Sequence, residues 1–492
     1  MGHKMSGSSD LNFADRVLRR LSPNSQLVDA PSGQAISAAE IRDSVTSAAA
    51  AFLSAGLQAG EPVLISCGLN PASTLAYLGA MYAGLVPVPL EDRSIETIGE
   101  SLASKTRSKA VWTEKAGQCT WAKQAGLPHF VGRFESRYNC LRVPAGRAET
   151  DLAALMPTSG STGVPRLVRV THGNLLANTE AIVRSQVLGA DERAMLILPL
   201  NYCFGASVIH SHLYQGGSVV FDPRFMFPDK VLRAIDTYGC TTFAGVPTVY
   251  NILIGRSSIR SISMPGLRRF LQAGGPLASK SIQTMREIVP HAEFFTMYGQ
   301  TEATSRISCL SPARLTEKLG SAGLALDNLI LRIADEAGEE LPEGQIGEVW
   351  VKGPSICDGY FEDREETERK FSDGWLKTGD LGALDQDGYL WIKGRKGDFM
   401  KIRGIRVSLA EVEAKVAATP GVYECAAASI PHPEAGEALA LFIVPEKGAN
   451  DVPERVRRAI PPQWTCSAVN LVADLPKTAN GKIARYLLKT MV

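Results

Sequence analysis

The chain has 492 residues, which is more than one ordinary domain holds and predicts two to four packed units. Apolar residues make up 45% and charged residues 21%, as in a folded globular protein, and a net charge of +1 argues against nucleic acid or an anionic membrane as a partner. Nine dispersed cysteines without a CxxC pair exclude a disulfide framework and predict thiols in a reducing compartment, with the cytoplasm as the default.

The chain begins with a polar, Ser- and Gly-rich segment at residues 1–10, which we expect to be disordered. The most apolar stretch, Thr74–Leu90, contains two glycines and two prolines and is too interrupted to span a membrane. His210 and His212 lie two residues apart, and we interpret them as structural, not as metal ligands. No secretory signal precedes these segments.

Apolar runs of strand length alternate with helical patterns along the chain. The expected strands are Pro62–Ser66, Met195–Leu198, Ser218–Phe221 and Phe294–Tyr298, and the expected helices include Asn174–Arg184 and Pro228–Tyr238. Strands that alternate with helices predict an α/β fold with parallel sheets.

A glycine-rich region at residues 385–407 divides the chain. The short strand patterns Tyr389–Lys393 and Phe399–Ile402 stand there among four glycines, and this composition predicts a flexible junction. We place the boundary between 394 and 395, so that residues 11–394 form a large core of layered α/β subdomains. Residues 395–492 then form a small α+β domain, in which we expect a helix at Leu409–Ala418 and a strand at Ala440–Val444.

The strongest local motif is Thr158-Ser159-Gly160-Ser161-Thr162-Gly163-Val164-Pro165-Arg166. Glycines let backbone N–H groups approach an anion closely, and hydroxyl groups add hydrogen bonds, so the segment can hold phosphates. Its spacing is not that of a Walker A loop. Taken alone, a flexible surface linker explains the composition equally well.

Two further motifs carry a carboxylate. Tyr298-Gly299-Gln300-Thr301-Glu302 follows an expected strand, and strand ends in α/β folds are where ligands bind. Its tyrosine can stack on a base, and its glutamate can hold Mg²⁺ together with phosphates. In Thr378-Gly379-Asp380 the aspartate can accept hydrogen bonds from a ribose diol. Each motif alone also fits an ordinary turn.

Two basic motifs complete the set. Gly394-Arg395-Lys396-Gly397-Asp398 lies at the junction, and Pro476-Lys477-Thr478-Ala479-Asn480-Gly481-Lys482 lies near the end of the chain. The long side chain of Lys482 can reach a remote anion. A solvated basic surface is the alternative for both.

All five motifs, in this order, resemble the adenylate-forming superfamily, which contains acyl- and aryl-CoA synthetases, nonribosomal peptide adenylation domains and luciferase. The resemblance extends from about Phe52 to the end of the chain and includes the block Leu75–Leu90. It implies a large N-terminal domain and a mobile C-terminal domain that rotates between two half-reactions. In relatives the pivot is usually Asp or Lys, and Gly397 matches it here.

The resemblance also implies a role for each matched residue. The phosphates of ATP would be held by Thr158, Ser159, Gly160, Ser161, Thr162, Gly163 and by Arg166, which replaces the usual lysine. The segment Gly274, Gly275 and Pro276 would lie against adenine, Tyr298 would stack on it beside Gly299, and Asp380 with Arg395 would bind the ribose. Thr301 would touch the α-phosphate, Glu302 and Thr162 would hold Mg²⁺, and Lys482 would bridge the acid and the α-phosphate.

The acid pocket that the resemblance implies is lined by Tyr202, Phe204, Gly205 and Ala273. Amino-acid-activating relatives carry an Asp where Gly205 falls. Without that carboxylate a buried ammonium would be unpaired, so we expect an acid that lacks an α-amino group. Gly205 is also expected to leave room for a bulky or ring-bearing acid.

The expected function is therefore an ATP- and Mg²⁺-dependent ligase that forms an acyl-adenylate and transfers the acyl group, with coenzyme A as the favoured acceptor. An amine or amino acid acceptor, or a carrier-protein thiol, stays open, and a homodimer is allowed. Other readings are a non-catalytic adenylate-binding protein and a luciferase-like oxidation. A Rossmann dehydrogenase is disfavoured because no G-x-G-x-x-G follows an early strand.

Overall fold

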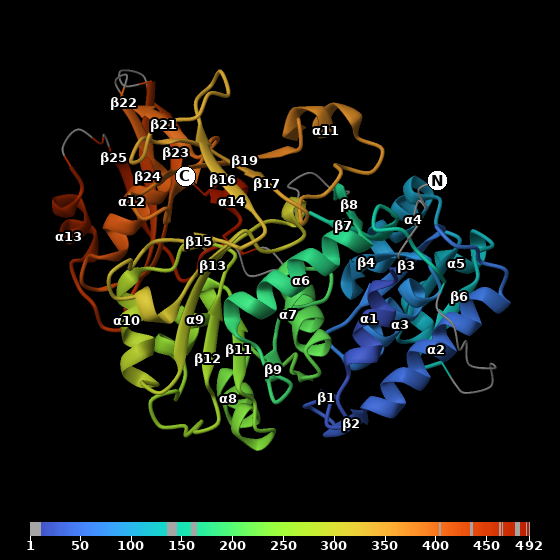
Figure 1. The fold of residues 1–492 in the computed structure, drawn as a ribbon. Coiled ribbons are helices and arrows are strands. Elements are labelled where there is room, and N and C mark those ends of the chain that lie inside the picture. Colours follow the sequence, from blue (N-terminus) through green and yellow to red (C-terminus); the bar gives the residue numbers. More distant parts are fainter. Residues whose placement is uncertain are drawn as a thin grey trace.

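The computed structural model describes residues 11–134, 145–158, 165–402, 405–432, 436–461, 464, 466–477, 483–488 and 490–491 (Figure 1). Residues 1–10, expected to be disordered, lie outside these ranges, as do the loop residues Ser159–Gly163 and the catalytic candidate Lys482. None of the helices in the described ranges combines the length and apolarity needed to cross a lipid bilayer.

A nine-stranded sheet forms the centre of the large N-terminal part, in the order β15-β14-β13-β12-β11-β9-β10-β1-β2. Strands β1, β10, β9, β11, β12 and β13 run parallel to one another, which confirms the predicted parallel sheet, while β2 and β14 pair with its two ends in antiparallel orientation. The strands are β1 Gln26–Asp29, β2 Gln34–Ser37, β9 Arg193–Leu196, β10 Ser218–Phe221, β11 Thr242–Gly245, β12 Arg269–Gln272, β13 Glu293–Tyr298, β14 Ser308–Leu310 and β15 Leu324–Ala325. Because parallel strands end at one edge, the residues after β12 and β13 become neighbours.

A second, parallel sheet has the order β4-β3-β5-β6. Its strands are β3 Pro62–Cys67, β4 Val86–Glu91, β5 Ala110–Thr113 and β6 His129–Val131, and its helices include α2 Ala38–Ser54, α3 Pro71–Tyr82 and α4 Ile95–Thr106. Helix α3 begins with Asn70 as its cap and Pro71 in its first turn. A Cβ atom at Gly79 would lie 2.4 Å from that of Ala48, so the glycine lets α3 pack closely on α2.

The hairpin of β7 Leu152–Pro157 and β8 Leu167–Thr171 leads into α6 His172–Gln186, and α7 Cys203–Tyr214 packs beside α6. His210 and His212 lie on α7 and are buried. The ring of His210 stacks on Tyr77 at 5.8 Å, and burial lowers its pKa to about 3. Both histidines are part of the core, as predicted.

A third sheet, with the order β16-β17-β19-β18 and β20 paired to β19, leads to the junction. Its strands are β16 Ile330–Ala334, β17 Gly347–Lys352, β18 Phe371–Ser372, β19 Trp375–Leu384 and β20 Leu390–Arg395, and helix α11 Arg364–Lys370 precedes β18. Strand β20 ends at Arg395 and β21 begins at Phe399, so residues 396–398 form the connection. The domain boundary between 394 and 395 stays a prediction.

The C-terminal part has a sheet of its own, in the order β22-β21-β24-β23 with β25 paired to β24, and its own apolar core. Its elements are β21 Phe399–Ile402, β22 Ile405–Ser408, α12 Leu409–Ala417, β23 Val422–His432, β24 Gly436–Pro445, α13 Val452–Ala459, β25 Cys466–Leu471 and α14 Arg485–Leu488. The expected helix and strand of this part are confirmed as α12 and as the middle of β24. In Figure 1 this part lies on the side of the nine-stranded sheet that carries β13 and β15.

Candidate active site

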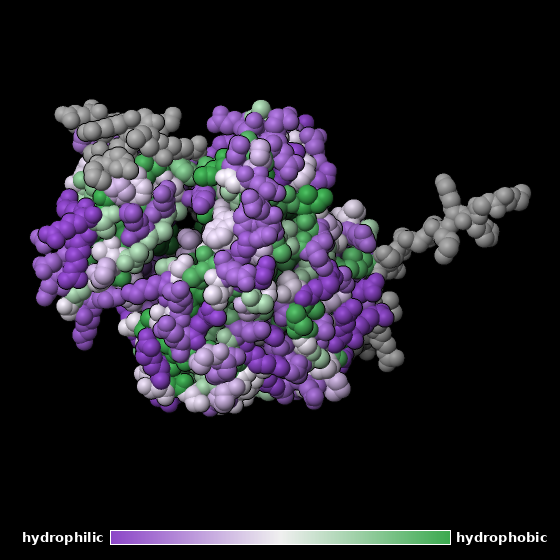
Figure 2. Space-filling model, turned by 60° about the vertical axis from the view of Figure 1, so that its left-hand side comes forward, coloured by the Kyte–Doolittle hydropathy of each residue, from purple (hydrophilic) through white to green (hydrophobic). Residues whose placement is uncertain are grey.

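A cavity of about 1920 Å³ lies between the large and the small part of the chain. Figure 2 shows the surface hollowed between these two parts. The predicted residues that line the cavity are Gly274, Gly275, Pro276, Tyr298, Gly299, Asp380 and Arg395. Ile483, which directly follows Lys482, lines the same cavity from the small part. Residues from segments that lie far apart in the sequence, such as Gly274 and Ile483, therefore line one cavity.

Tyr298, Asp380 and Arg395 form one cluster at the cavity. The hydroxyl of Tyr298 donates a hydrogen bond of 2.6 Å to Oδ2 of Asp380. Arg395 pairs with Asp380 in the register of β19 and β20, and its Nε lies 3.4 Å from Oδ1. Burial raises the pKa of the Asp380 carboxyl group, and Arg395 opposes this shift. The cluster therefore fixes the orientation of a buried carboxylate that can accept hydrogen bonds from a diol.

Glycines shape the wall on which a planar group could lie. Gly274 has φ +90°, and the side-chain amide of Gln272 donates a hydrogen bond of 2.8 Å to the carbonyl of Gly275. A Cβ atom at Gly299 would lie 1.8 Å from the carbonyl oxygen of Ser305, so no other residue fits there without backbone movement. These glycines keep side chains out of the cavity and let its backbone segments lie close together.

Glu302 lies in the short 3₁₀ helix η3, Thr301–Ala303, directly after the strand end. The hydroxyl of Tyr360 donates a hydrogen bond of 2.6 Å to Oε1 of Glu302, and the Cys357 N–H donates to the Glu302 carbonyl at 3.0 Å. Among the described residues no group of three or more metal-ligating side chains occurs. One oriented carboxylate still fits Mg²⁺, because this ion usually takes one or two carboxylates and completes its shell with phosphates and water.

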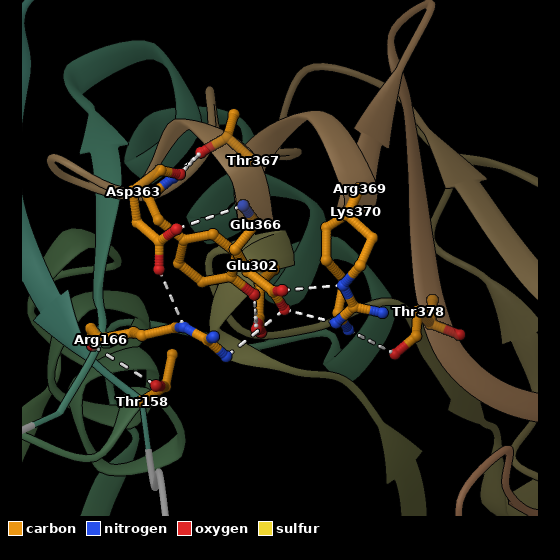
Figure 3. A network of polar contacts seen from close by, with 10 residues as sticks. Thr158, Arg166, Glu302, Asp363, Glu366, Thr367, Arg369, Lys370 and Thr378 are labelled. Atoms are coloured by element: carbon orange, nitrogen blue, oxygen red, sulfur yellow. Dashed lines mark hydrogen bonds and ion pairs between the residues drawn. The ribbon is translucent and has the colours of Figure 1, made fainter. Parts of the chain in front are cut away.

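Arg166 joins the end of the predicted phosphate loop to the start of α11. Its Nε lies 3.0 Å from Asp363 and its Nη1 3.4 Å from Glu366 at the start of α11, and its guanidinium lies 5.9 Å from the centre of the Tyr360 ring. Figure 3 shows Arg166 reaching from the loop end toward both carboxylates, with Glu302 close by. Arg166 thus links the end of the predicted phosphate loop to the start of α11. Its planar guanidinium can bind two carboxylates at once, which the usual lysine does less well.

At the other end of the loop the N–H of Thr158 donates a hydrogen bond of 2.9 Å to the Arg166 carbonyl, which closes the loop base. Residues Ser159, Gly160, Ser161, Thr162 and Gly163 lie outside the described residues, and so does the predicted metal role of Thr162. The described base of the loop is connected to Glu302 through Tyr360, whose ring lies under Arg166 and whose hydroxyl binds Glu302.

The predicted acid-pocket residues Tyr202, Phe204, Gly205 and Ala273 are all buried, and the rings of Tyr202 and Phe204 meet edge to face at 6.3 Å. Gly205 has a different role from the one expected. A Cβ atom there would lie 2.3 Å from the carbonyl oxygen of Pro199 and 2.7 Å from that of Leu198. A side chain at this position would point into the backbone of Leu198 and Pro199. Glycine is therefore needed for α7 to begin close to these two residues, and it does not clear space for a bulky acid.

Arg306 is a buried residue of this region that the sequence reasoning missed. Its guanidinium lies 4.9 Å from the centre of the Phe204 ring, and the residue is 2% exposed. A signal was present in the sequence, because Arg306 interrupts the otherwise uncharged run Thr304–Leu310 directly after the Glu302 motif.

Gly397 lies in the exposed turn between β20 and β21. A Cβ atom there would meet nothing within 4 Å, and its φ is not in the left-handed region. The N–H of Asp398 donates to the carbonyl of Arg395 at 2.9 Å and closes the turn. Neither packing nor backbone strain therefore demands glycine at this position.

The chain resembles known adenylate-forming proteins in sequence and in fold. The sequence pattern of the AMP-binding enzyme family matches residues 16–361, and that of the AMP-binding enzyme C-terminal domain matches residues 411–482. A feruloyl-CoA synthase from Amycolatopsis sp is 30% identical over 485 residues, which cover 95% of this chain and 96% of the synthase. The crystal structure of ATP-bound MatB from Rhodopseudomonas palustris superposes with a TM-score of 0.88 at 28% identity, over 98% of each chain. The amide bond synthetase McbA from Marinactinospora thermotolerans superposes with a TM-score of 0.86 at 25% identity, over 97% of this chain and 99% of McbA.

Proposed function

Because the chain belongs to the AMP-binding enzyme family, we propose that it activates a carboxylic acid with ATP and transfers the acyl group to coenzyme A. In the first half-reaction a carboxylate oxygen forms a bond to the α-phosphorus of ATP, and the bond from that phosphorus to the bridging oxygen breaks. Pyrophosphate leaves, and an acyl-adenylate remains. In the second half-reaction a thiol attacks the acyl carbon, AMP leaves, and the thiol proton passes to solvent.

One observation carries the proposal: Ile483, next to Lys482, lines the same cavity as Tyr298 and Asp380. The reaction brings two anions together, and preorganised positive groups reduce their repulsion. Glu302 with phosphate oxygens is proposed to hold Mg²⁺, which when bound would neutralise phosphate charge. Lys482 is proposed to contact the acid and the α-phosphate, and Thr301 to orient that phosphate.

We further propose that the acid has no α-amino group. In the matching position of amino-acid-activating relatives an Asp pairs with the ammonium, and here Gly205 offers no carboxylate. The backbone of Leu198 and Pro199 leaves no room for a side chain at this position, so no carboxylate can be supplied there without rearrangement. An amino acid would bring a buried ammonium without that partner.

The test is acid-dependent release of pyrophosphate from ATP. The purified protein is given a panel of carboxylic acids, and the wild type is compared with Lys482→Ala and with Lys415→Ala, an exposed lysine of α12 in the same small part. We expect Lys482→Ala to lower the rate by about 10²–10³-fold, as the removal of one preorganised donor commonly does, while Lys415→Ala leaves it unchanged. Equal behaviour of the wild type and Lys482→Ala would favour a non-catalytic adenylate-binding protein instead.

An amide-forming ligase is the second candidate, and the likeness to the amide bond synthetase McbA favours it. Gly397 fits this alternative, since an altered pivot could accompany a changed second half-reaction. Each acid that releases pyrophosphate is offered coenzyme A, amines and a carrier protein, and the products are weighed by mass spectrometry. A thioester supports the first candidate and an amide the second. A cytoplasmic location and a homodimer stay predictions.

A further inference from the structure

Arg306 is a buried cation that forms no ion pair with any residue in the described part of the chain. Within the described ranges its Nε and Nη1 have no hydrogen-bond partner, and no carboxylate there lies within ion-pair distance of it. The groups that act on it electrostatically are the thiols of Cys309 and Cys203 and the hydroxyl of Tyr202, whose ordinary pKa values of about 8.5 and about 10 leave them mostly uncharged at neutral pH. The guanidinium nevertheless stays charged, because its intrinsic pKa is far above neutral.

The contact with Phe204 does not compensate for this burial. Attraction between a guanidinium and one aromatic ring is weaker than the cost of removing the cation from water. Arg269 is similarly buried, and its Nε and Nη1 also have no hydrogen-bond partner, but it forms an ion pair with the buried carboxylate of Glu192. Arg306 lacks such a carboxylate, which points to a ligand group as its partner.

The main chain of Arg306 is held against a segment that lines the nucleotide cavity. Asn178 binds its main chain from both sides, donating to the Arg306 carbonyl at 2.9 Å and accepting from the Arg306 N–H at 3.2 Å. A Cβ atom at Gly299, which lines the cavity, would lie 3.0 Å from the Cα of Arg306. The side chain in turn lies over Phe204, on the segment proposed to line the acid pocket. The main chain of Arg306 therefore packs against cavity-lining Gly299, while its guanidinium faces the segment proposed to line the acid pocket.

We propose that Arg306 determines substrate specificity by pairing with a second carboxylate on the acid, so that the preferred substrates are dicarboxylic acids. This inference rests on the proposed function. A carboxylate neutralises the guanidinium and can bind its fork through two oxygens, whereas an uncharged acyl chain leaves the cation buried without a partner. The same positive charge repels an α-ammonium group, which agrees with the proposed exclusion of amino acids.

The experiment compares matched acids in pyrophosphate release. Straight-chain dicarboxylic acids of three to eight carbons are paired with monocarboxylic acids of the same length, and terephthalic acid is paired with 4-methylbenzoic acid. We expect the wild type to prefer the better dicarboxylic acids by about 30-fold or more in kcat/KM, the range typical of a buried charge pair. In Arg306→Met we expect kcat/KM with the dicarboxylic acids to fall by about 30-fold as well. With the monocarboxylic acids, kcat/KM should change by less than about threefold.

Thermal denaturation separates specificity from folding. Arg306→Met replaces an unpaired buried cation by an apolar side chain, so its midpoint should equal or exceed that of the wild type. The dicarboxylic acid raises the midpoint of the wild type but not of Arg306→Met. Arg269→Met is the control: it leaves Glu192 buried without its partner and lowers the midpoint, while the preference for dicarboxylic acids stays.

Two outcomes overturn the inference alone. One is a wild type that uses monocarboxylic acids as well as their dicarboxylic partners, and the other is a folded Arg306→Met that loses both classes equally. Absence of pyrophosphate release with every acid overturns the proposed function instead.

Discussion

The hydroxyl of Tyr360 donates a hydrogen bond of 2.6 Å to Oε1 of Glu302, although 58 residues separate the two in the chain. Tyr360 is 5% exposed, and both its burial and the nearby Glu302 charge raise the pKa of its phenol, so the phenol keeps its proton at neutral pH. Arg166 lies over the same ring. The tyrosine therefore connects the base of the predicted phosphate loop to the carboxylate proposed to hold Mg²⁺.

Tyr360→Phe should weaken the dependence on Mg²⁺ without unfolding the protein. The phenyl ring keeps the packing, but one oxygen of Glu302 loses the donor that orients it. A hydrogen bond to a charged group contributes about 1.5–3 kcal/mol, so we expect at least a tenfold rise in the Mg²⁺ concentration that gives half-maximal pyrophosphate release. Tyr214→Phe removes an equivalent bond of 2.6 Å to Glu180 between α7 and α6, and should leave the Mg²⁺ dependence unchanged. Equal Mg²⁺ curves for the wild type and Tyr360→Phe would contradict the role assigned to this contact.

Asp380→Asn should separate stability from nucleotide binding. The folded state raises the pKa of Asp380, mainly through burial, so the fold favours the neutral form of this carboxyl group. The protonated Asp380 carboxyl group therefore adds to the free energy of unfolding. This contribution is complete below the ordinary carboxyl pKa of about 4, and it is lost as the pH rises through the higher pKa of Asp380 in the folded protein. Asparagine stays neutral, and its carbonyl can still accept the hydrogen bond from Tyr298.

We therefore expect the denaturation midpoint of Asp380→Asn to match that of the wild type in acid and to equal or exceed it at neutral pH. The KM for ATP should rise by about tenfold or more, because an amide accepts hydrogen bonds from a ribose diol less strongly than a carboxylate. Midpoints measured from pH 3 to 8, together with ATP titrations at pH 7.5, test both parts. A midpoint that falls only at neutral pH would show that the carboxylate stabilises the fold.

The sequence predicted the strands best where an apolar run is bounded by glycine or proline. Ser218–Phe221 matches β10 to the residue, because a strand buried on both faces needs an uninterrupted apolar run. The motif residues Tyr298, Asp380 and Arg395 were predicted to act together, and the structure places them in one cluster. Asp380 and Arg395 lie opposite each other on the antiparallel strands β19 and β20, and Tyr298 ends the strand β13 of the parallel sheet, so each motif lies at a strand position that the pairing of strands fixes.

Contacts that depend on distant segments could not be predicted from the sequence. Nothing near Glu302 in the sequence points to Tyr360, and nothing near Arg166 points to the carboxylates at the start of α11. The unpaired state of Arg306 depends on which side chains surround it after folding. The prediction for Gly205 was wrong for a related reason. Its small size suggested space for a substrate, but the structure shows that glycine is needed there because two backbone segments approach closely.

Gly397→Ala should stabilise the chain slightly and slow the exchange between its two half-reactions. The site has room for a Cβ atom and no left-handed φ, so alanine fits, and Gly→Ala at such sites stabilises by about 0.4–1 kcal/mol through the unfolded chain. The narrower backbone freedom should also hinder rotation of the small part. Pyrophosphate release in a single turnover should stay unchanged while the overall turnover falls. Gly117→Ala in η2, Ala116–Gln118, has equal room and should raise the stability alone. An unchanged overall turnover in Gly397→Ala would exclude a hinge role.

Arg256 holds the small part against the large one in the arrangement seen here. It ends α9, Pro247–Arg256, and its guanidinium lies 4.9 Å from the centre of the Tyr423 ring in β23, with Nη1 3.5 Å from Asp474. Both charged side chains are about half exposed, so the ion pair contributes little, and the ring contact contributes about 0.5–1 kcal/mol. Because Ile483 lines the nucleotide cavity in this arrangement, these contacts should favour the pose that serves adenylation.

Arg256→Ala should therefore slow adenylation by up to about tenfold, since 1.4 kcal/mol corresponds to a factor of ten in a population. Transfer from a preformed acyl-adenylate should keep its rate or become faster, because the small part leaves the adenylation pose more readily. Stopped-flow measurement of each half-reaction separates the two effects. Arg260→Ala, which removes an exposed arginine four residues further along the chain, should change neither rate. If Arg256→Ala slows both half-reactions equally, the contact serves general stability and does not select one pose.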